Sequence, residues 1–475
     1  MSLKLYDIVI IGGGINGAGI ARDAAMRGLN VGLFEAKDFA CATSSNSSKL
    51  IHGGLRYLEY YEFGLVRKAL KERKKLMKIA PHIISPLKFT LPYEKHLRPW
   101  LLLRLGLFLY DFLAPFSVFK FSRAEFFKSD SPVGEHITSG FSYYDGWVDD
   151  ARLVLLNIIS AKEHGAEIHP HTKITSIEYS KAGNGYELEL EDGNCVHART
   201  VVNAAGPWAD GFFRDKASLR LVKGSHIIVP EIFSKEEGAF ILQNKDKRIV
   251  FAIPYEEKYT LIGTTDVQYK GDPYKAEISD EEEDYLVDIV NRYFKKQITK
   301  GDIVWRYSGV RPLLEDNADN PSAVTRDYRF DFKEGRLDIF GGKLTTYRIL
   351  AKEAVDRLCS FLDVTAKCMT HKEPLPGGHI DDFNAFVAHK IEQYHNLPEQ
   401  LICRYARLYG DRMDHVLAQL GEDFGENVYS GELDYAMDNE YVTCAEDFLW
   451  RRTKLGLHVS KNVQQRIKEY IEGKL

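Results

Sequence analysis

Residues 6–35 arrange a glycine-rich turn between apolar segments, in the order strand, turn, helix and strand. The segment 6–11 is rich in β-branched residues, 15–27 has helical spacing, and 31–34 is a second short apolar run. The turn, GGGING at 12–17, satisfies the spacing GxGxxG. Glycines at this spacing permit a tight turn and the close approach of a diphosphate, and the helix N-terminus supplies partial positive charge. The sequence therefore predicts a dinucleotide-binding βαβ unit.

Glu35 ends the second predicted strand, 18 residues after Gly17, where its carboxylate can accept both ribose hydroxyls. Three features favour FAD over NAD. The fingerprint begins within a dozen residues of the N-terminus, VVNAAGPW at 201–208 is typical of a late strand beside the cofactor, and FGGKLTTY at 340–347 places a second glycine turn at a helix start. Backbone N–H groups at such a helix start would favour the negative charge of a reduced flavin.

The composition is that of an ordinary folded protein. Hydrophobic residues make up 44% and charged residues 28% of the 475 residues, which argues against a disordered chain, a collagen-like chain and a multi-span membrane protein. The six cysteines form no CxxC pair, so we expect neither a disulfide framework nor a structural zinc site. The N-terminus lacks the pattern of a signal peptide, and we expect the chain to stay inside the cell.

Changes in sequence pattern divide the chain into domains of an α/β protein. We expect a discontinuous, Rossmann-like FAD-binding domain, built from 1–95, 145–215 and 337–368 around a mainly parallel sheet. The β-rich segment 216–336 is expected to form a mixed or antiparallel sheet that covers the flavin and binds the substrate. Residues 370–475 have a helical pattern and are expected to form a C-terminal cap domain.

Residues 96–144 are expected to be an apolar and basic segment that faces a membrane. Between 64 and 128 the chain carries fourteen Lys and Arg against four acidic residues, although its net charge is −5. The stretch 100–119 is the most apolar part of this segment. A helix that spans a bilayer needs about 20 mostly apolar residues, and Arg104, Asp111 and Pro115 interrupt this stretch, so we do not expect it to span a membrane. An apolar patch ringed by cations is typical of interfacial binding to anionic lipid. The alternatives are a buried core segment and a subunit interface.

Seven longer motifs are spread along the chain: ATSSNSSKLIHGGLRYLE (42–59), YDGWVDDARL (144–153), KGSHIIVP (223–230), GTTDVQYKGDP (263–273), YSGVRPL (307–313), TRDY (325–328) and FGGKLTTYR (340–348). In these motifs, and over nearly its whole length, the sequence resembles the FAD-dependent glycerol-3-phosphate dehydrogenases of the bacterial aerobic, respiratory type. The resemblance implies oxidation of sn-glycerol 3-phosphate to dihydroxyacetone phosphate, with electrons passed to a membrane quinone. With the basic apolar segment, it implies peripheral binding to the cytoplasmic face of the inner membrane.

The resemblance also implies which residues form the site. At the substrate it places Arg56, Tyr57, Arg326 and His52, with the first three on the phosphate. Around the reacting carbinol it places His226, Arg311 and Lys343. The implied cofactor-binding residues are Gly12, Gly14, Ile15, Asn16, Gly17, Glu35, Thr43, Ser44, Ser47, Lys49, Ala205, Gly206, Gly342, Lys343, Leu344 and Thr345. No residue is implied in metal binding.

Oxidation of a secondary alcohol by hydride transfer requires a base for the hydroxyl proton and cations near the developing alkoxide, and a phosphate favours arginine forks. His226 is the candidate base because imidazole can take a proton near neutral pH. Lys343 is the alternative, since a lysine crowded by arginines can become neutral. Asp145, Asp149 and Asp150 have no histidine at metal-binding spacing and are interpreted as a turn and a helix cap.

Other functions remain as alternatives. An oxidase would use O2 and release H2O2, but relatives with oxidase activity typically carry an insertion in the middle of the chain, which is absent here. An amino-acid oxidase would bind a carboxylate with one arginine. The four cations of the implied site suit a phosphate better; they are Arg56, Arg311, Arg326 and Lys343. A non-catalytic flavin-binding scaffold would not need those cations. We expect non-covalent FAD and no nucleic-acid partner; a homodimer is left open.

Overall fold

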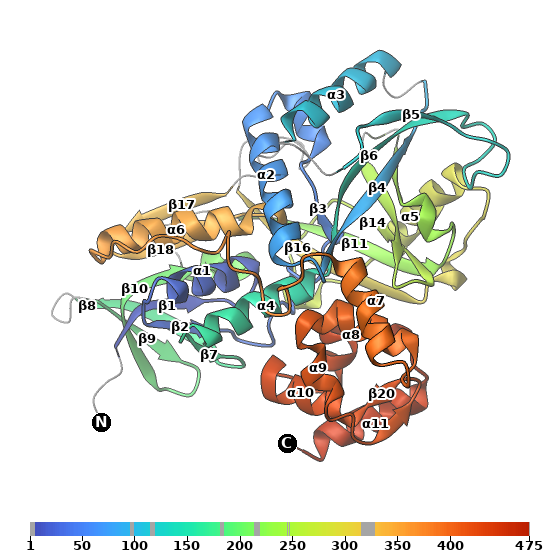
Figure 1. Cartoon of the computed structure of the whole chain (residues 1–475). Coiled ribbons are helices and arrows are strands. Elements are labelled where there is room, and N and C mark those ends of the chain that lie inside the picture. Colours follow the sequence, from blue (N-terminus) through green and yellow to red (C-terminus); the bar gives the residue numbers. More distant parts are fainter. Residues whose placement is uncertain are drawn as a thin grey trace.

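β1 (Leu5–Ile11) lies inside a mainly parallel sheet whose other strands come from distant parts of the chain (Figure 1). The computed structural model describes residues 5–95, 99–114, 119–180, 185–212, 219–244, 246, 248–314 and 328–474, without the side chains of Arg56, Glu59 and Tyr60. The strand order is β17 (Arg329–Lys333), β18 (Arg336–Phe340), β10 (Cys195–Asn203), β1, β2 (Val31–Phe34) and β7 (Glu167–His169).

The carboxyl ends of three parallel strands meet at one edge of this first sheet. β1 pairs in parallel with β2 and with β10, and β10 pairs in parallel with β18. The glycine turn 12–17 follows β1, the segment 204–206 follows β10, and the second glycine turn follows β18. Because ligands of open α/β sheets bind beyond the carboxyl ends of the strands, this edge is where a dinucleotide is expected.

Both faces of the first sheet are covered. Ile8 and Ile10 belong to the core formed with α1 (Ile15–Met26), α4 (Asp150–Glu163) and α6 (Tyr347–Phe361). Tyr6 and Val9 belong to a second core beside the hairpin of β8 (Ile174–Ser180) and β9 (Gly185–Leu190). Successive side chains of a strand point to opposite faces, so β1 is apolar along its length because both faces are buried.

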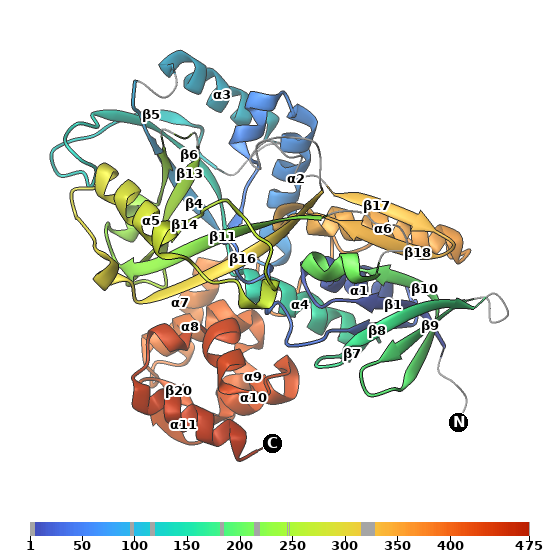
Figure 2. The same ribbon diagram turned by 180° about the vertical axis from the view of Figure 1, so that it is seen from behind.

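A second, larger sheet lies beside the first one (Figure 2). Its order is β15 (Val267–Gln268), β11 (Leu219–Pro230), β14 (Tyr259–Gly263), β13 (Ile249–Tyr255), β12 (Ala239–Gln243), β4 (Ile84–Pro92), β6 (Ser139–Val148) and β3 (Leu50–Ile51); β16 (Trp305–Leu314) pairs with β11, and β5 (Arg123–Phe126) with β6.

The limits of the two sheets differ from those expected from the sequence. β3 and β4 lie within 1–95, yet they pair with β6, and β4 continues to β12 in the second sheet. The end of β6, beyond residue 144, also belongs to this sheet. These pairings are non-local, and no sequence pattern within a single strand indicates which distant strand it joins.

Helices cover both faces of the second sheet. α5 (Asp280–Tyr293) packs on β11–β14 in one core. On the other face, α2 (Phe63–Ile79) and α3 (Trp100–Leu113) contribute Val66, Leu70, Leu107 and Tyr110 to a core with the strands. α3 lies at the outer end of the molecule, far from the C-terminal helices (Figure 1). None of the helices in the described ranges has the length and apolar character needed to cross a bilayer.

The C-terminal part is largely helical and lies below the second sheet, next to α4 (Figure 1). It consists of α7 (Phe383–Gln393), α8 (Glu399–Tyr409), α9 (Met413–Leu417), the hairpin of β19 (Asp423–Gly425) and β20 (Val428–Tyr429), α10 (Ser430–Glu440), a π-helical turn at Asp447–Arg452, and α11 (Lys461–Glu472). The first sheet is mainly parallel and the second is mixed. Together with the helical C-terminal domain, they confirm the predicted α/β fold class.

Candidate active site

The glycine turn after β1 is closely packed at two positions and open at a third. Gly12 has φ +105°, and a Cβ there would lie 2.6 Å from the carbonyl oxygen of Ala204. A Cβ on Gly17 would lie 1.9 Å from the carbonyl oxygen of Gly12, which excludes any side chain. A Cβ on Gly14 would meet only the Ser44 hydroxyl, at 3.2 Å. No acidic residue lies in the first turn of α1, so this helix N-terminus can bind a diphosphate.

The carboxylate of Glu35 is fixed at the end of β2. Its Oε2 accepts a hydrogen bond from the backbone N–H of Gly13 at 2.6 Å, and its Oε1 accepts one from Lys37 at 2.9 Å. Burial raises the pKa of Glu35, and the backbone N–H donors oppose that rise. A carboxylate has about four acceptor positions, so two remain for ribose hydroxyls. The open Gly14, the helix N-terminus and this acceptor fit the adenosine diphosphate part of FAD.

The glycine turn after β18 packs against the start of α1. Asn16 donates from Nδ2 to the carbonyl oxygen of Gly341 at 3.0 Å, and its buried Oδ1 has no hydrogen-bond partner among the described residues. Gly342 has φ +113°, and a Cβ there would lie 2.9 Å from Asn16 Nδ2. Leu344 and Thr345 follow in a short 3-10 turn before α6. The backbone of this turn therefore adjoins the dinucleotide edge, where Ala205 and Gly206 also follow β10.

The cofactor loop (residues 41–49) connects the βαβ unit to the second sheet. Ser44 accepts a hydrogen bond at Oγ from the backbone N–H of Ile15, at 3.0 Å. Thr43 donates from Oγ1 to the carbonyl oxygen of Val310 on β16, at 2.6 Å. These two residues, predicted at the cofactor, thus tie the loop to the start of α1 on one side and to the second sheet on the other.

Two further cofactor-loop residues are held by an aspartate. Ser47 Oγ donates to Asp150 at 2.7 Å, and the ammonium of Lys49 lies 2.5 Å from the other oxygen of the same carboxylate. Lys49 also donates to the carbonyl oxygen of Ser45 at 3.0 Å. The side chains of Ser47 and Lys49 therefore fix the shape of the loop through Asp150.

His226 lies on β11 directly opposite Tyr307 of β16 and faces the cofactor loop. The two rings are stacked with centroids 4.7 Å apart, and Nε2 of His226 lies 2.9 Å from Ser48 Oγ. Burial lowers the pKa of His226 well below its ordinary value, and the charges of Arg311 and Lys49 lower it further. The imidazole is therefore neutral at neutral pH, as a proton acceptor must be.

Arg311 lies four residues further along β16, on the same face as Tyr307. Its Nη1 forms an ion pair with Asp266 at 2.5 Å, and its Nη2 donates to the hydroxyl of Thr264 at 3.2 Å. A Cβ on Gly224, in the adjacent strand, would lie 2.6 Å from Nη2, so this glycine leaves space for the guanidinium. The cation is partly exposed and is held in a defined position.

Lys343 and Tyr57 lie side by side. The ammonium of Lys343 lies 4.2 Å from the centroid of the Tyr57 ring, within cation–π range. The backbone N–H of His52 donates to Thr345 Oγ1 at 3.2 Å. The short segment 48–52 thus contacts His226 through Ser48 and the Lys343 turn through His52.

Two predicted substrate residues cannot be placed in this geometry. Arg326 lies outside the described residues. Arg56 lies in the 3-10 turn Leu55–Tyr60, but its side chain is not described. The implied phosphate site is therefore represented by Tyr57 alone.

The three aspartates of YDGWVDDARL have separate partners. Asp149 accepts from the backbone N–H of Arg152 as the N-cap of α4, as interpreted from the sequence, and it also pairs with Lys454. Asp145 pairs with Arg73. Within the described ranges, no cluster of metal-ligating side chains is found.

Several site residues were not singled out from the sequence. Four of them lie inside the quoted motifs but act only through a neighbour. Ser48 and Tyr307 contact His226, and Thr264 and Asp266 contact Arg311. Lys454 lies in the segment EDFLWRRTKLG at 446–456, which is not one of the seven motifs, and more than 300 residues after its partner Asp149. No local pattern could have indicated such contacts.

The arrangement can oxidise an alcohol next to a flavin. A neutral imidazole can accept the hydroxyl proton, while Arg311 and Lys343 can stabilise an alkoxide as it develops. FAD, when bound, supplies the hydride acceptor. Side chains of these types can orient a substrate, accept its proton and provide positive charge.

Comparisons with known proteins identify the family of the chain. The family model described as FAD dependent oxidoreductase matches residues 7–329, and the model described as the C-terminal domain of alpha-glycerophosphate oxidase matches residues 368–473. Glycerol-3-phosphate dehydrogenase of Pseudomonas aeruginosa is 48% identical over 99% of this chain and 96% of the relative. D-erythritol 1-phosphate dehydrogenase of Brucella abortus is 45% identical, over 98% of both chains.

A solved structure extends the likeness to the fold. The glycerol-3-phosphate dehydrogenase from Bacillus halodurans, complexed with FAD, superposes with a TM-score of 0.76 at 28% identity and covers 100% of this chain and 95% of that chain. The predicted cofactor, FAD, is confirmed by the family model and by this FAD complex. The chain belongs to the family of FAD-dependent glycerol-3-phosphate dehydrogenases.

Proposed function

We propose that the chain oxidises sn-glycerol 3-phosphate to dihydroxyacetone phosphate, with FAD as hydride acceptor and a membrane quinone as the final electron acceptor. The dehydrogenase activity named for its relatives supports the reaction. The exposed apolar side chains of α3 support the quinone as acceptor.

The observation that carries the proposal is the placement of His226. Its neutral ring is held between Tyr307 and Ser48, and Arg311 lies on the same face of the β11–β16 pair. We assign His226 as the base for the carbinol proton, with Lys343 as the alternative. Arg311 and Lys343 would stabilise the alkoxide, and hydride departure to FAD would leave the ketone.

The substrate phosphate is assigned to Arg56, Tyr57 and Arg326, with His52 beside them. The assignment follows the family resemblance for the two arginines. For Tyr57, the nearby ammonium of Lys343 adds positive charge at a place where a dianion needs it.

A second candidate substrate is D-erythritol 1-phosphate, because a relative at 45% identity is named for it. That compound has the same phosphate and a secondary alcohol, with one more carbon. The two substrates would differ at the end of the site away from the phosphate.

The electron acceptor is assigned from the surface of α3. Leu101, Leu105, Phe108 and Phe112 are all exposed on this helix, between 60% and 77%. Apolar side chains at this exposure favour burial at a lipid interface. We infer that α3 rests on the cytoplasmic face of the inner membrane, where a water-insoluble quinone can reach the reduced flavin.

An anaerobic titration tests the activity and its alternatives. Adding sn-glycerol 3-phosphate should bleach the flavin absorbance, and D-erythritol 1-phosphate should do so with a much higher half-saturating concentration. Adding a quinone analogue should then restore the colour much faster than O2 does. Faster reoxidation by O2 would identify an oxidase, and an unbleached flavin with both substrates would identify a non-catalytic flavoprotein.

A further inference from the structure

Two adjacent aspartates at the start of α4 are held by lysines from opposite sides. The ammonium of Lys454, from the C-terminal domain, lies 2.6 and 2.7 Å from the two carboxylate oxygens of Asp149. The ammonium of Lys49, from the cofactor loop, lies 2.5 Å from Asp150. All four side chains are buried. This four-residue charge network joins the C-terminal domain to the cofactor loop.

Asp150 determines the shape of the cofactor loop. Besides Lys49, it accepts hydrogen bonds from the hydroxyl of Ser47 at 2.7 Å and from its backbone N–H at 3.3 Å. Lys49 in turn binds the carbonyl oxygen of Ser45, and its own backbone has φ +55°. A non-glycine residue in this left-handed region needs support from its surroundings. Loss of the Lys49–Asp150 pair would remove that support.

The balance of charge in the network depends on Lys454. Burial would raise the pKa of Asp149, but Lys454 and then Lys49 outweigh it and hold that pKa below its ordinary value. Burial raises the pKa of Asp150, and the neighbouring charge of Asp149 adds to the rise. Without Lys454, two buried carboxylates would compete for the single ammonium of Lys49. The contact of Lys49 with Asp150 would then weaken.

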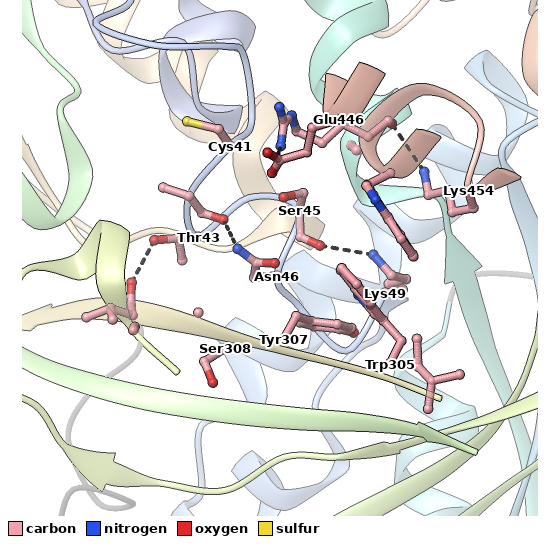
Figure 3. Close-up of a pocket in the computed structure, with 18 of the residues that line it drawn as sticks. Cys41, Thr43, Ser45, Asn46, Lys49, Trp305, Tyr307, Ser308, Glu446 and Lys454 are labelled. Atoms are coloured by element: carbon pink, nitrogen blue, oxygen red, sulfur yellow. Dashed lines mark hydrogen bonds and ion pairs between the residues drawn. The ribbon is translucent and has the colours of Figure 1, made fainter. Parts of the chain in front are cut away.

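Lys454 is itself rigidly placed. In the preceding π-helical turn, Arg452 pairs with Asp38 at 2.7 Å, and the ring of Trp450 stacks on that of Trp305 of β16 at 3.6 Å. Lys454 and Lys49 both line one cavity of about 240 Å³, whose walls come from the cofactor loop, β16 and the C-terminal domain. Figure 3 labels both side chains. The C-terminal domain thus presents its ammonium at a fixed distance from the loop.

We propose that Lys454 is a positioning residue through which the C-terminal domain sets the conformation of the cofactor loop and the affinity for FAD. It acts through Asp149, Asp150 and Lys49, without contact with the cofactor. This role depends on the balance of charge. If Lys454 is replaced by a neutral residue, removing the charge of Asp149 as well should therefore restore the affinity for FAD.

The test measures FAD release from the holoenzyme by the rise in flavin fluorescence after dilution. Lys454→Met should release FAD at least tenfold faster than the unmodified protein. Lys454→Arg should retain most of the affinity, and Lys454→Met combined with Asp149→Asn should recover it to within about threefold. Asparagine can still cap α4, so this second change removes charge and keeps the cap.

Arg412→Met is the matched control. Arg412 also belongs to the C-terminal domain and also pairs with α4, through Glu163 at 2.6 Å, but at the far end of the helix. It should leave FAD release unchanged. Equal loss of FAD in this control would show that domain docking in general is responsible, and would overturn the proposal.

Two other results would also overturn it: unchanged FAD release in Lys454→Met, or a double variant that binds FAD no better than the single one. Should Lys454→Met fail to fold, the double variant decides alone. Tight FAD binding by the double variant supports the charge network, and weak binding by a folded double variant contradicts it.

Discussion

The hydroxyl of Ser48 lies 2.9 Å from Nε2 of His226, while Nδ1 of the same ring is buried without a hydrogen-bond partner among the described residues. If Nε2 carries the proton and donates to Ser48, the lone pair of Nδ1 is available to a substrate hydroxyl. The partner of one ring nitrogen determines the state of the other. Ser48 thus connects the cofactor loop to the choice of tautomer in the candidate base.

Ser48→Ala should therefore slow flavin reduction by the substrate without releasing FAD. A single hydrogen bond contributes about 0.5–1.5 kcal/mol, so we expect up to about a tenfold decrease in the reduction rate. Stopped-flow reduction of the holoenzyme measures the rate. Ser48→Thr keeps the hydroxyl and should stay near the original rate; an equally slow threonine variant would separate Ser48 from the orientation of His226.

The pH dependence of flavin reduction should identify the base. Burial, with Arg311 and Lys49, places the pKa of His226 well below its ordinary value. The neutral, proton-accepting form then predominates above about pH 6.5, the ordinary value for histidine, and is lost as the pH falls through the lowered pKa. The rate at low substrate should be flat near neutrality and decline only in acid.

His226→Gln should lower the rate throughout and remove that acid decline. Arg311→Met serves for comparison. It should slow flavin reduction, but because His226 is still present, the acid decline should remain. If the glutamine variant keeps the acid decline, His226 has a structural role and the assignment of the base moves to Lys343.

Gly14→Val should abolish FAD binding while the protein still folds. The nearest non-neighbouring atom to a Cβ on Gly14 is Ser44 Oγ at 3.2 Å, so little protein stands in the way, but a branched side chain would occupy the path of the diphosphate. The purified variant should be colourless, with a far-UV circular dichroism spectrum like that of the original. Retained yellow absorbance would place the diphosphate elsewhere.

Much of this architecture is local enough to be predicted from the sequence. The strand, glycine turn and helix of residues 6–27 depend on β-branched residues, glycine and helical spacing within one short window. Glu35 could be assigned because its distance from the glycines is set by the same unit. The sequence pattern also predicts helices at about 64–80, 151–164 and 279–296. The structure has α2, α4 and α5 at these places, with ends that differ by at most a few residues.

What could not be predicted is non-local. The assignment of β4 and β6 to the second sheet depends on pairing between strands about 50 residues apart. The ion pair of Lys454 with Asp149 spans more than 300 residues. The family resemblance implies that Ser47 and Lys49 bind the cofactor, but Asp150 holds their side chains, and only the fold brings Asp150 within reach.

The exposed face of α3 is narrower than the apolar stretch 100–119. Within the apolar stretch, Leu107 and Tyr110 are buried, and Trp100 and Leu103 pack against the same core. The side chains available to a membrane are Leu101, Leu102, Leu105, Phe108 and Phe112, with Phe121 and Phe126 on the following segment. Helical periodicity separates these two faces, which composition alone does not.

Leu105→Ser combined with Phe108→Ser and Phe112→Ser should abolish binding to vesicles that contain anionic lipid. These side chains are 60–77% exposed, so their replacement removes apolar area that burial in the interface would stabilise by about 25 cal/mol per Å², and it costs the fold little. Co-sedimentation over a salt series measures the binding, and quinone reduction in vesicles should fall with it while anaerobic flavin reduction stays unchanged. Phe361→Ser, which removes an exposed phenylalanine from α6, is the matched control and should bind vesicles normally. Undiminished sedimentation of the triple variant would exclude α3 as the membrane-binding surface.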